Sequence, residues 1–431
     1  MKYCLVILFL SLSLPFCFSQ DVLSLEDAKM LTLENNFGIR ISKNNVKVAE
    51  NLTDRKLNGY LPTVSFGAGL NATFGGGNQQ FSNGLEAGTS NALNWGGNAS
   101  VQANYTVLDK QRDLTLEQLK EGLALTNLQL RQSIEQSLIA VYNAYYQLAL
   151  QKENVSALEE TIDVSRERFR RAKYQLEYGQ GNGLNVLNAE VDIKRDSVNL
   201  LNALLSIDNG KRNLNIAMGR NSTADFEIEA LSDINTALSL NTLLETAREN
   251  NVNLQINRQN LMVNEMDLNI IEAEKKPTLS AGASYGFNYA NNAAGSFIDE
   301  STSQGLTGNV TLAWTLYDPT RDIRKENTVL SLTNLKLEAE QIEQALERDI
   351  ANAWANYQNA IFILDVEESA VETNRENFTR TEEQVKIGRL TSLDFRQAQL
   401  NLLGAQTSLN NAKLNAKLAE IQLLALVGDL L

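Results

Sequence analysis

TLSAGASYGFNY, the stretch at residues 278–289, alternates strictly between apolar and small polar side chains. The same alternation recurs at residues 63–74, 98–107 and 308–317. Because successive side chains of a strand point to opposite faces, each stretch predicts a strand with one apolar and one polar face. Strands of about 9–11 residues with this pattern are typical of membrane barrels. A half-buried strand of a soluble sandwich would show the same alternation, so other features of the chain are needed to distinguish the two.

The first residues read as an export signal. Lys2 is the charged end, residues 5–14 form the apolar core, and a small-x-small cleavage site predicts removal of a signal peptide at residues 1–19. Both cysteines, Cys4 and Cys17, lie in this segment, and the chain has no histidine. We therefore expect no disulfide, no thiol chemistry, no metal site and no cofactor in the mature chain.

The mature chain would carry 37 basic and 52 acidic residues, a formal charge of −15. This acidic balance argues against nucleic acid and anionic lipid as partners. After the signal there is no apolar run of about 18 residues, so the sequence offers no transmembrane helix. A chain without such a helix can enter a membrane only as a closed barrel, because unpaired backbone groups are too costly in hydrocarbon. We therefore expect the outer membrane of a Gram-negative bacterium, with an extension into the periplasm.

The mature chain contains two copies of one repeat unit. Glu34-Asn35-Asn36 recurs as Glu249-Asn250-Asn251, and the offset between equivalent positions stays between 209 and 215 residues. Such self-similarity over nearly the whole chain indicates an internal duplication. Further equivalent pairs are Pro62 and Pro277, Asp109 and Asp318, Phe169 and Phe378, Gly179 and Gly388, Leu184 and Leu393, and Gly219 and Gly428.

Each half predicts the same order of elements: two shorter helices, a strand, a glycine-rich loop, a second strand and a hairpin of two very long helices. The repeats are expected at residues 20–219 and 240–431, joined by an equatorial linker at 220–239. The strands are expected at about 63–74, 98–108, 278–289 and 308–317, and the loops 75–97 and 290–307 between them are expected to be extracellular. The long helices are expected at about 110–178, 184–218, 320–387 and 393–427.

Apolar residues recur every seven positions along the long helices. Two heptad helices joined by a short turn predict an antiparallel coiled-coil hairpin. Because the rest of the helix surface is polar, such a hairpin suits the wall of a tube that is wet inside and outside. The predicted seams are Leu148, Val155, Ile162, Phe169 and Leu176 with Leu184, Val191, Val198 and Leu205, and Tyr357, Leu364, Val371, Phe378 and Val385 with Leu393, Leu400, Thr407 and Leu414.

These features resemble the TolC family of outer-membrane efflux channels over nearly all of the mature chain. The resemblance is carried by Asn58-Gly59-Tyr60-Leu61-Pro62 with its counterpart Lys275-Lys276-Pro277, and by residues 388–399 with their equivalent at 179–190. Four strands cannot close a barrel alone, so chains have to share one. The resemblance implies a mainly α fold with a membrane β-barrel: a homotrimer whose four β-strands per chain form a 12-stranded barrel, continued by a long α-helical periplasmic barrel.

The resemblance also implies a passive exit duct. Its partners would be a periplasmic adaptor (membrane fusion) protein, an inner-membrane efflux pump or ABC exporter, and outer-membrane lipid. The sequence shows no phosphate loop, metal cluster or catalytic triad, so we expect no enzyme. A type I protein secretion duct is the alternative function, and a purely structural periplasmic spacer is disfavoured by the amphipathic strands. Drug, metal and protein export are not distinguished.

A glycine cluster at residues 179–183 superficially resembles a dinucleotide-binding loop. It follows a helix instead of a strand, which excludes that interpretation. We interpret it as a hairpin turn at the periplasmic tip, where the resemblance implies adaptor docking; a plain turn without a contact role is the alternative. The expected docking residues are Gly179, Gln180, Gly181, Asn182, Gly183, Gly388, Arg389, Leu390, Thr391 and Ser392.

The resemblance places an acidic ring at the periplasmic aperture, and Asp394 stands at its position. A solvated carboxylate at a helix N-terminus is the alternative role. The sequence departs from the family pattern in three places: Asn185 is the first-half equivalent of Asp394, Gln397 occupies a second acidic position, and Leu390 occupies a basic one. The salt bridge that closes the aperture in relatives is therefore not reproduced.

Overall fold

The structure is a computed structural model that describes residues 22–229, 234, 238–292 and 298–430. The predicted signal peptide at residues 1–19 lies outside these residues. The described chain divides into two compact units. One unit comprises residues up to Arg40, Ser133–Asn251 and Leu346 onwards, and the other comprises Ile41–Gln132 and Val252–Ala345.

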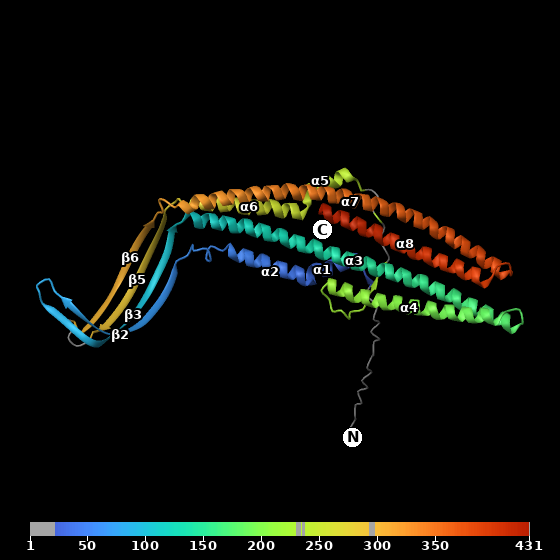
Figure 1. Ribbon diagram of the computed structural model, residues 1–431, viewed down its shortest axis with the longest axis horizontal. Coiled ribbons are helices and arrows are strands. Elements are labelled where there is room, and N and C mark those ends of the chain that lie inside the picture. The colour runs from blue at the N-terminus through green and yellow to red at the C-terminus, as the bar shows by residue number, and fades with distance from the viewer. Residues whose placement is uncertain (1–21, 230–233, 235–237, 293–297, 431) are drawn as a thin grey trace, which may run out of the picture. The chain divides into compact units, whose positions relative to one another are not determined.

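The second unit contains a four-stranded antiparallel sheet. Its strands lie in the order β2 (Thr63–Gln80), β3 (Glu86–Leu108), β5 (Thr278–Asn291) and β6 (Glu300–Ala313), as Figure 1 shows. The register aligns the apolar positions of all four strands on one face. One such row is Phe66, Val101, Tyr285 and Leu306, and the neighbouring row on the polar face is Ser65, Gln102, Ser284 and Thr307.

The strands extend further than the alternation predicts. Most of the predicted loop 75–97 is strand, and the turn between β2 and β3 is only residues 81–85. Similarly, β5 continues to Asn291, and β6 begins at Glu300 and ends at Ala313 instead of running over 308–317. The prediction was wrong here because it followed side-chain alternation. Ladder hydrogen bonds belong to the backbone and continue through glycine, asparagine and serine.

The helices next to the sheet begin close to the strand ends. Pro62 and Pro277 directly precede β2 and β5, whereas Pro319 is the first residue of α7, where proline is tolerated because no backbone donor is needed. Near the first junction, the Tyr60 hydroxyl donates a 2.7 Å hydrogen bond to Asp113. The unit also contains most of α2 (Phe37–Leu52), α6 (Val252–Ala273) and the first parts of α3 (Lys110–Glu177) and α7 (Pro319–Lys386).

The four long helices lie within one residue of their predicted bounds. They are α3 and α7, of 68 residues each, with the returning helices α4 (Gly183–Ala217) and α8 (Ser392–Val427). At about 1.5 Å per residue, α3 and α7 each span about 100 Å. Among the described residues, no helix is both long enough and apolar enough to cross a membrane.

The first unit has its core where the returning helices end. Strand β1 (Val22–Leu23) pairs in parallel with β4 (Glu227–Ile228), which lies within the predicted linker 220–239. The Tyr145 hydroxyl donates a 3.0 Å hydrogen bond to the Leu23 carbonyl, and burial raises the pKa of Tyr145 to about 12. Helix α1 (Leu25–Asn35) packs against this core through Leu25 and Leu31, and α5 (Leu240–Asn250) contacts α8. The core residues include Leu23, Val141, Tyr145, Leu214, Met218, Phe226 and Ile228.

The duplicated Glu-Asn-Asn motif has the same structural role in both repeats. The side-chain amide of Asn36 donates a 2.8 Å hydrogen bond to the Ala217 carbonyl at the end of α4. The amide of Asn251 donates an equivalent 2.8 Å bond to the Leu426 carbonyl at the end of α8. Each asparagine thus satisfies a carbonyl in the last turn of a long helix, where intrahelical donors run out.

The heptad seam of α4 differs from the predicted one. Leu184, Val191, Val198 and Leu205 are each more than half exposed, whereas the buried or half-buried seven-residue pattern passes through small residues such as Ala189 and Gly210. A Cβ added at Gly210 would lie 3.0 Å from Leu148 of α3. The seam of α4 alternates large apolar residues with smaller ones, and the smaller ones let α4 approach α3 closely. The seam positions of α4 are Val186, Ala189, Ile193, Asp196, Leu200, Ala203, Ile207, Gly210 and Leu214.

The second hairpin uses the equivalent seam, 209 residues later. In α8 it passes through Phe395, Ala398, Leu402, Ala412 and Ala416, all buried. Of the predicted seam residues in α8, Leu393 is exposed and Leu414 is buried. The predicted positions along α7, from Tyr357 to Val385, are buried or half-buried, as expected.

This seam predicts unequal costs for two leucines of α8. Replacing buried Leu402 by alanine should destabilise the protein by about 2–5 kcal/mol, because it leaves a cavity. Replacing exposed Leu393 should change stability by no more than about 0.5 kcal/mol. Thermal unfolding in detergent measures both, and equal losses would contradict the seam.

Candidate functional site

Eight of the ten predicted docking residues lie in the two hairpin turns, and Gly183 and Ser392 are the first residues of α4 and α8. Gly179 and Gly388 occupy equivalent positions with φ angles of 71° and 76°, in the left-handed region that favours glycine. The backbone N–H of Gln180 donates to the Gln175 carbonyl at 2.7 Å, and that of Arg389 donates to the Gln384 carbonyl at 2.9 Å. These backbone bonds close the last turns of α3 and α7, so each glycine is required for the chain reversal.

The two returning helices are capped differently. Asn182 caps α4, and its side-chain oxygen accepts a 2.8 Å hydrogen bond from the Leu184 backbone. Thr391 caps α8 in a capping box with Asp394. The hydroxyl and backbone N–H of Thr391 donate to Asp394 Oδ2 at 2.6 and 2.9 Å, and the Asp394 N–H donates back at 3.2 Å.

This box keeps the Asp394 carboxylate charged. The hydrogen bonds from the Thr391 side chain and backbone lower the pKa of Asp394 below its ordinary value, and the side chain is exposed. Asp394 therefore has the structural role of a helix-end carboxylate and also presents a stable negative charge at the tip. The two roles weighed for it from sequence are compatible.

The other predicted aperture residues are uncharged and exposed. Asn185 lies on the first turn of α4, and Gln397 donates a 2.8 Å hydrogen bond to Asn401 on α8. Within the described residues, no hydrogen bond joins Asp394 to Asn185 or Gln397. The structure thus places Asn185 and Asp394 on the first turns of α4 and α8 and Gln397 on the second turn of α8, and none of the described hydrogen bonds joins them.

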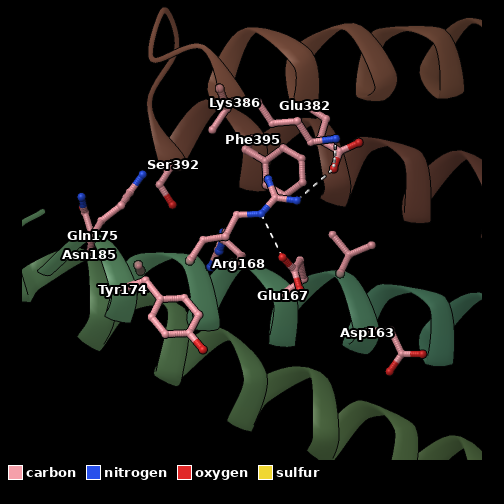
Figure 2. A pocket seen from close by; sticks show the side chains of 14 residues that line it. Asp163, Glu167, Arg168, Tyr174, Gln175, Asn185, Glu382, Lys386, Ser392 and Phe395 are labelled. Atoms are coloured by element: carbon pink, nitrogen blue, oxygen red, sulfur yellow. Dashed lines mark hydrogen bonds and ion pairs between the residues drawn. The ribbon is translucent and has the colours of Figure 1, made fainter. Parts of the chain in front are cut away.

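A hollow of about 700 Å³ lies between the two hairpins near their tips. Figure 2 shows side chains around it from α3, α4, α7 and α8, including Tyr174, Asn185 and Phe395. Arg171 of α3 crosses the hollow to Glu382 of α7 at 3.5 Å and also contacts Glu167 at 3.1 Å. The hairpins are therefore joined near the tips by an ion pair, Arg171 with Glu382, beside a partly apolar hollow.

Sequence reasoning missed a buried polar cluster immediately below this hollow. It joins Arg396 of α8 to Asp196 of α4 and Ser165 of α3. The signal that could have identified it is the position of Asp196, which interrupts the small and apolar residues spaced three and four apart along the seam of α4.

Comparison with known proteins agrees with this geometry. A family model described as outer membrane efflux protein matches residues 30–220 and 243–429, one match for each half of the duplication. The chain belongs to the outer membrane efflux protein family. Membership confirms the predicted resemblance to TolC-type channels and the location in the outer membrane with a periplasmic extension. No curated protein sequence matches the chain.

Solved channels share the fold at low sequence identity. The outer-membrane channel OprN is 17% identical with a TM-score of 0.72, over 94% of this chain and 89% of OprN. The CmeC channel of Campylobacter jejuni is 15% identical with a TM-score of 0.70, over 94% of this chain and 85% of CmeC. The MtrE channel of Neisseria gonorrhoeae, in its open state, is 16% identical with a TM-score of 0.68, over 94% of this chain and 88% of MtrE.

The capping box predicts a pH-dependent stability of the α8 tip. Because the pKa of Asp394 is lowered on folding, its contribution is present above the ordinary aspartate pKa and is lost as the pH falls below about 4. Thr391→Ala should cost about 1 kcal/mol and remove most of this pH dependence. Amide hydrogen exchange of residues 392–394 measures it, with Asn182→Ala in α4 as the control. An unchanged pH profile in Thr391→Ala would contradict the role of the box.

Proposed function

We propose that three copies of this chain form one outer-membrane channel, in which twelve strands share a barrel and the long helices build a periplasmic tunnel. The observation that carries this proposal is the exposure of the sheet on its apolar face and along both edges. Leu70 is 89% exposed and Leu306 is 78% exposed, although both are large and apolar. Contiguous apolar surface of this kind marks a membrane or protein contact.

The edge strands need partners for the same reason. In the described sheet, β2 and β6 each have a neighbour on one side only. Open edges are not tolerated in hydrocarbon, because each unpaired backbone group there costs several kcal/mol. Pairing β2 of one copy with β6 of the next closes the barrel and satisfies both edges.

The height of the apolar face matches a membrane. Trp95 and Tyr289 stack at one end of the face with ring centroids 5.3 Å apart, and Leu279 with Leu312 marks the other end. Ten residues of β5 separate these rows, about 34 Å along the strand. At a barrel tilt of about 40° this gives a band about 25 Å tall, the height typical of outer-membrane barrels.

The exposed stripe of α4 supports a helical contact between copies. Leu184, Val191, Val198 and Leu205 repeat every seven residues on the side facing away from α3. Such a stripe is suited to pack against a helix of a neighbouring chain. The stripe predicted as the hairpin seam is thus proposed to lie between copies.

The channel would be a passive duct for small molecules. The turns at 179–183 and 388–392 would dock a periplasmic adaptor, and an inner-membrane efflux pump or ABC exporter would supply the energy. Asp394, with Asn185 and Gln397, would line the periplasmic aperture, where three carboxylates around one axis favour cations through their combined field. The family is one of channels and not of enzymes, and we assign no catalytic role to the chain.

Deleting the chain in its host tests the exported class. Loss of a small-molecule duct should increase susceptibility to several toxic compounds and leave the secreted proteins unchanged. Loss of a single secreted protein with unchanged susceptibility would instead support the type I secretion alternative.

Two adjacent residues of β6 test the barrel. Leu306→Arg should cost about 2–4 kcal/mol near the middle of the bilayer, whereas Thr307→Arg on the polar, lumen-facing side should be tolerated. Leu312→Arg, near the strand end, should cost less than Leu306→Arg because the penalty depends on depth. Folding into detergent-resistant trimers measures all three, and a water-soluble monomer of the unchanged chain would refute the proposal.

Cysteines at the tips test docking. Cysteines replacing Gln180 or Arg389 should crosslink to a periplasmic adaptor in cells, because both side chains lie in exposed turns. A cysteine replacing Asn78, at the far end of the sheet in β2, should not. Equal crosslinking at all three positions would contradict the orientation.

A further inference from the structure

Arg396 and Asp196 form an ion pair that is almost completely buried. Their side chains are 5% and 3% exposed. Nη2 of Arg396 donates to Asp196 Oδ1 at 2.6 Å and Nη1 donates to Oδ2 at 2.8 Å, so the contact has two parallel bonds. Such paired bonds fix both the distance and the orientation of the guanidinium plane.

Neighbouring polar groups complete the cluster. Ser165 of α3 donates to Asp196 Oδ2 at 2.8 Å, and Gln399 donates to the Thr161 carbonyl at 2.8 Å while accepting from Arg396 at 2.9 Å. Asp192 of α4 lies 3.6 Å from Arg396 Nε and pairs with Arg168 of α3. The cluster therefore joins three helices, α3, α4 and α8.

The duplication provides this cluster only once. The first-half equivalent of Arg396 is Leu187, which is exposed, and the second-half equivalent of Asp196 is Ala405. The charged residues thus come from different positions in the two repeats and meet only where α8 of the second repeat packs on the first hairpin. The cluster is not a general feature of these hairpins.

We infer that Arg396 is a positioning residue that fixes the axial register of the second hairpin against the first. Asp394 and Gln397 lie within two residues of Arg396, so the register also fixes where these proposed aperture residues stand. The effect on the aperture residues rests on the proposed function, whereas the role of Arg396 in the register of the helices does not depend on it.

The seams alone do not determine this register. Apolar patterns that repeat every seven residues accept a shift of one heptad, about 10 Å along the axis. A shift in one direction would put Leu403 opposite Asp196 and leave a buried carboxylate without its guanidinium; a shift in the other direction would bring Arg389 there, but Arg389 lies in the turn before α8 and not on the helix. A buried unpaired charge is strongly unfavourable, so the shifted arrangement is excluded.

The location of the cluster adds to this argument. The hollow between the hairpins lies beside Arg396 and reaches toward the tips, where Ser392 and Phe395 line it. Apolar contact between the hairpins is interrupted there. Below the cluster, α8 and α3 are tied again by a 2.9 Å hydrogen bond from Asn410 to Asn154. Among the described polar contacts between α8 and the first hairpin, that of Arg396 is the one nearest the tips that is both buried and fixed in geometry.

A buried ion pair adds little net stability compared with an apolar pair. Replacing both charged residues by leucine can therefore restore stability, so that any remaining change in helix register is measured separately. Arg396→Leu alone should lower the melting temperature by several degrees, since it strands Asp196. Arg396→Leu with Asp196→Leu should recover most of this loss. If the ion pair only stabilised the contact between the helices, the double leucine variant would also regain the normal axial register. If the ion pair specifies the register, the double leucine variant should be stable but misaligned.

Register is read from thiol crosslinking. Cysteines at positions 154 and 410, in a chain whose other cysteines lie in the expected signal segment, report the alignment of α3 and α8. In folded trimers isolated by size exclusion, the double leucine variant should give a crosslink yield several-fold below that of the unchanged pair. The matched control replaces the exposed pair Arg380 and Glu376 by leucine and should keep the full yield.

If the double variant does not fold, single substitutions answer the same question. Arg396→Gln keeps a hydrogen-bond donor without the charge and should lose yield, whereas Arg396→Lys keeps the charge and should retain most of it. Full crosslink yield in the folded double variant, or in Arg396→Gln, would overturn the inference. Single-channel conductance of the same samples tests the aperture separately. If the crosslink is lost but the conductance is unchanged, Arg396 still fixes the register, and the proposed role of Asp394 and Gln397 at the aperture is refuted.

Discussion

The packing of large and small seam residues between the two helices of each hairpin is the contact on which this structure depends. A long helix with a mostly polar surface gains little from burial except along its seam. At Gly210 the added Cβ would already meet Leu148, so the distance between α3 and α4 is set by the absence of side chains on α4. The same arrangement recurs in α8 through Ala398, Ala412 and Ala416. The hairpins are thus held by close approach at the small seam residues together with apolar contact at large ones such as Leu214 and Leu402.

The two halves of the duplication have the same elements but different surroundings. Helix α4 is buried along its small-residue seam and exposes a regular stripe of leucine and valine. Helix α8 is buried along the equivalent seam and on a second face, which carries Arg396, Gln399 and Asn410. Polar residues lie on that second face because it meets the first repeat, where hydrogen bonds specify one alignment among several that apolar contacts would accept.

The tips combine local geometry with exposed chemistry. Gly179 and Gly388 reverse the chain because only glycine adopts a positive φ without strain, and Asp394 stays ionised because Thr391 donates two hydrogen bonds to it. These features depend on residues within a few positions of each other. In the other unit, the sheet exposes an apolar face and two edges.

The sequence by itself determined the duplication, the order of elements, the bounds of the long helices, the glycine turns and the family. Each of these features depends on local periodicity or on residues close together in the chain. The sequence did not determine the length of β2 and β3, because backbone ladders continue where side-chain alternation stops. It also did not determine which of two heptad stripes on α4 faces α3, since both repeat every seven residues. Only the tertiary structure decided that choice: it buries the stripe that contains Ala189 and Leu214 and leaves Val191 and Val198 exposed. The same packing brings Arg396 to Asp196 across 200 residues of sequence, a separation at which no local pattern carries information.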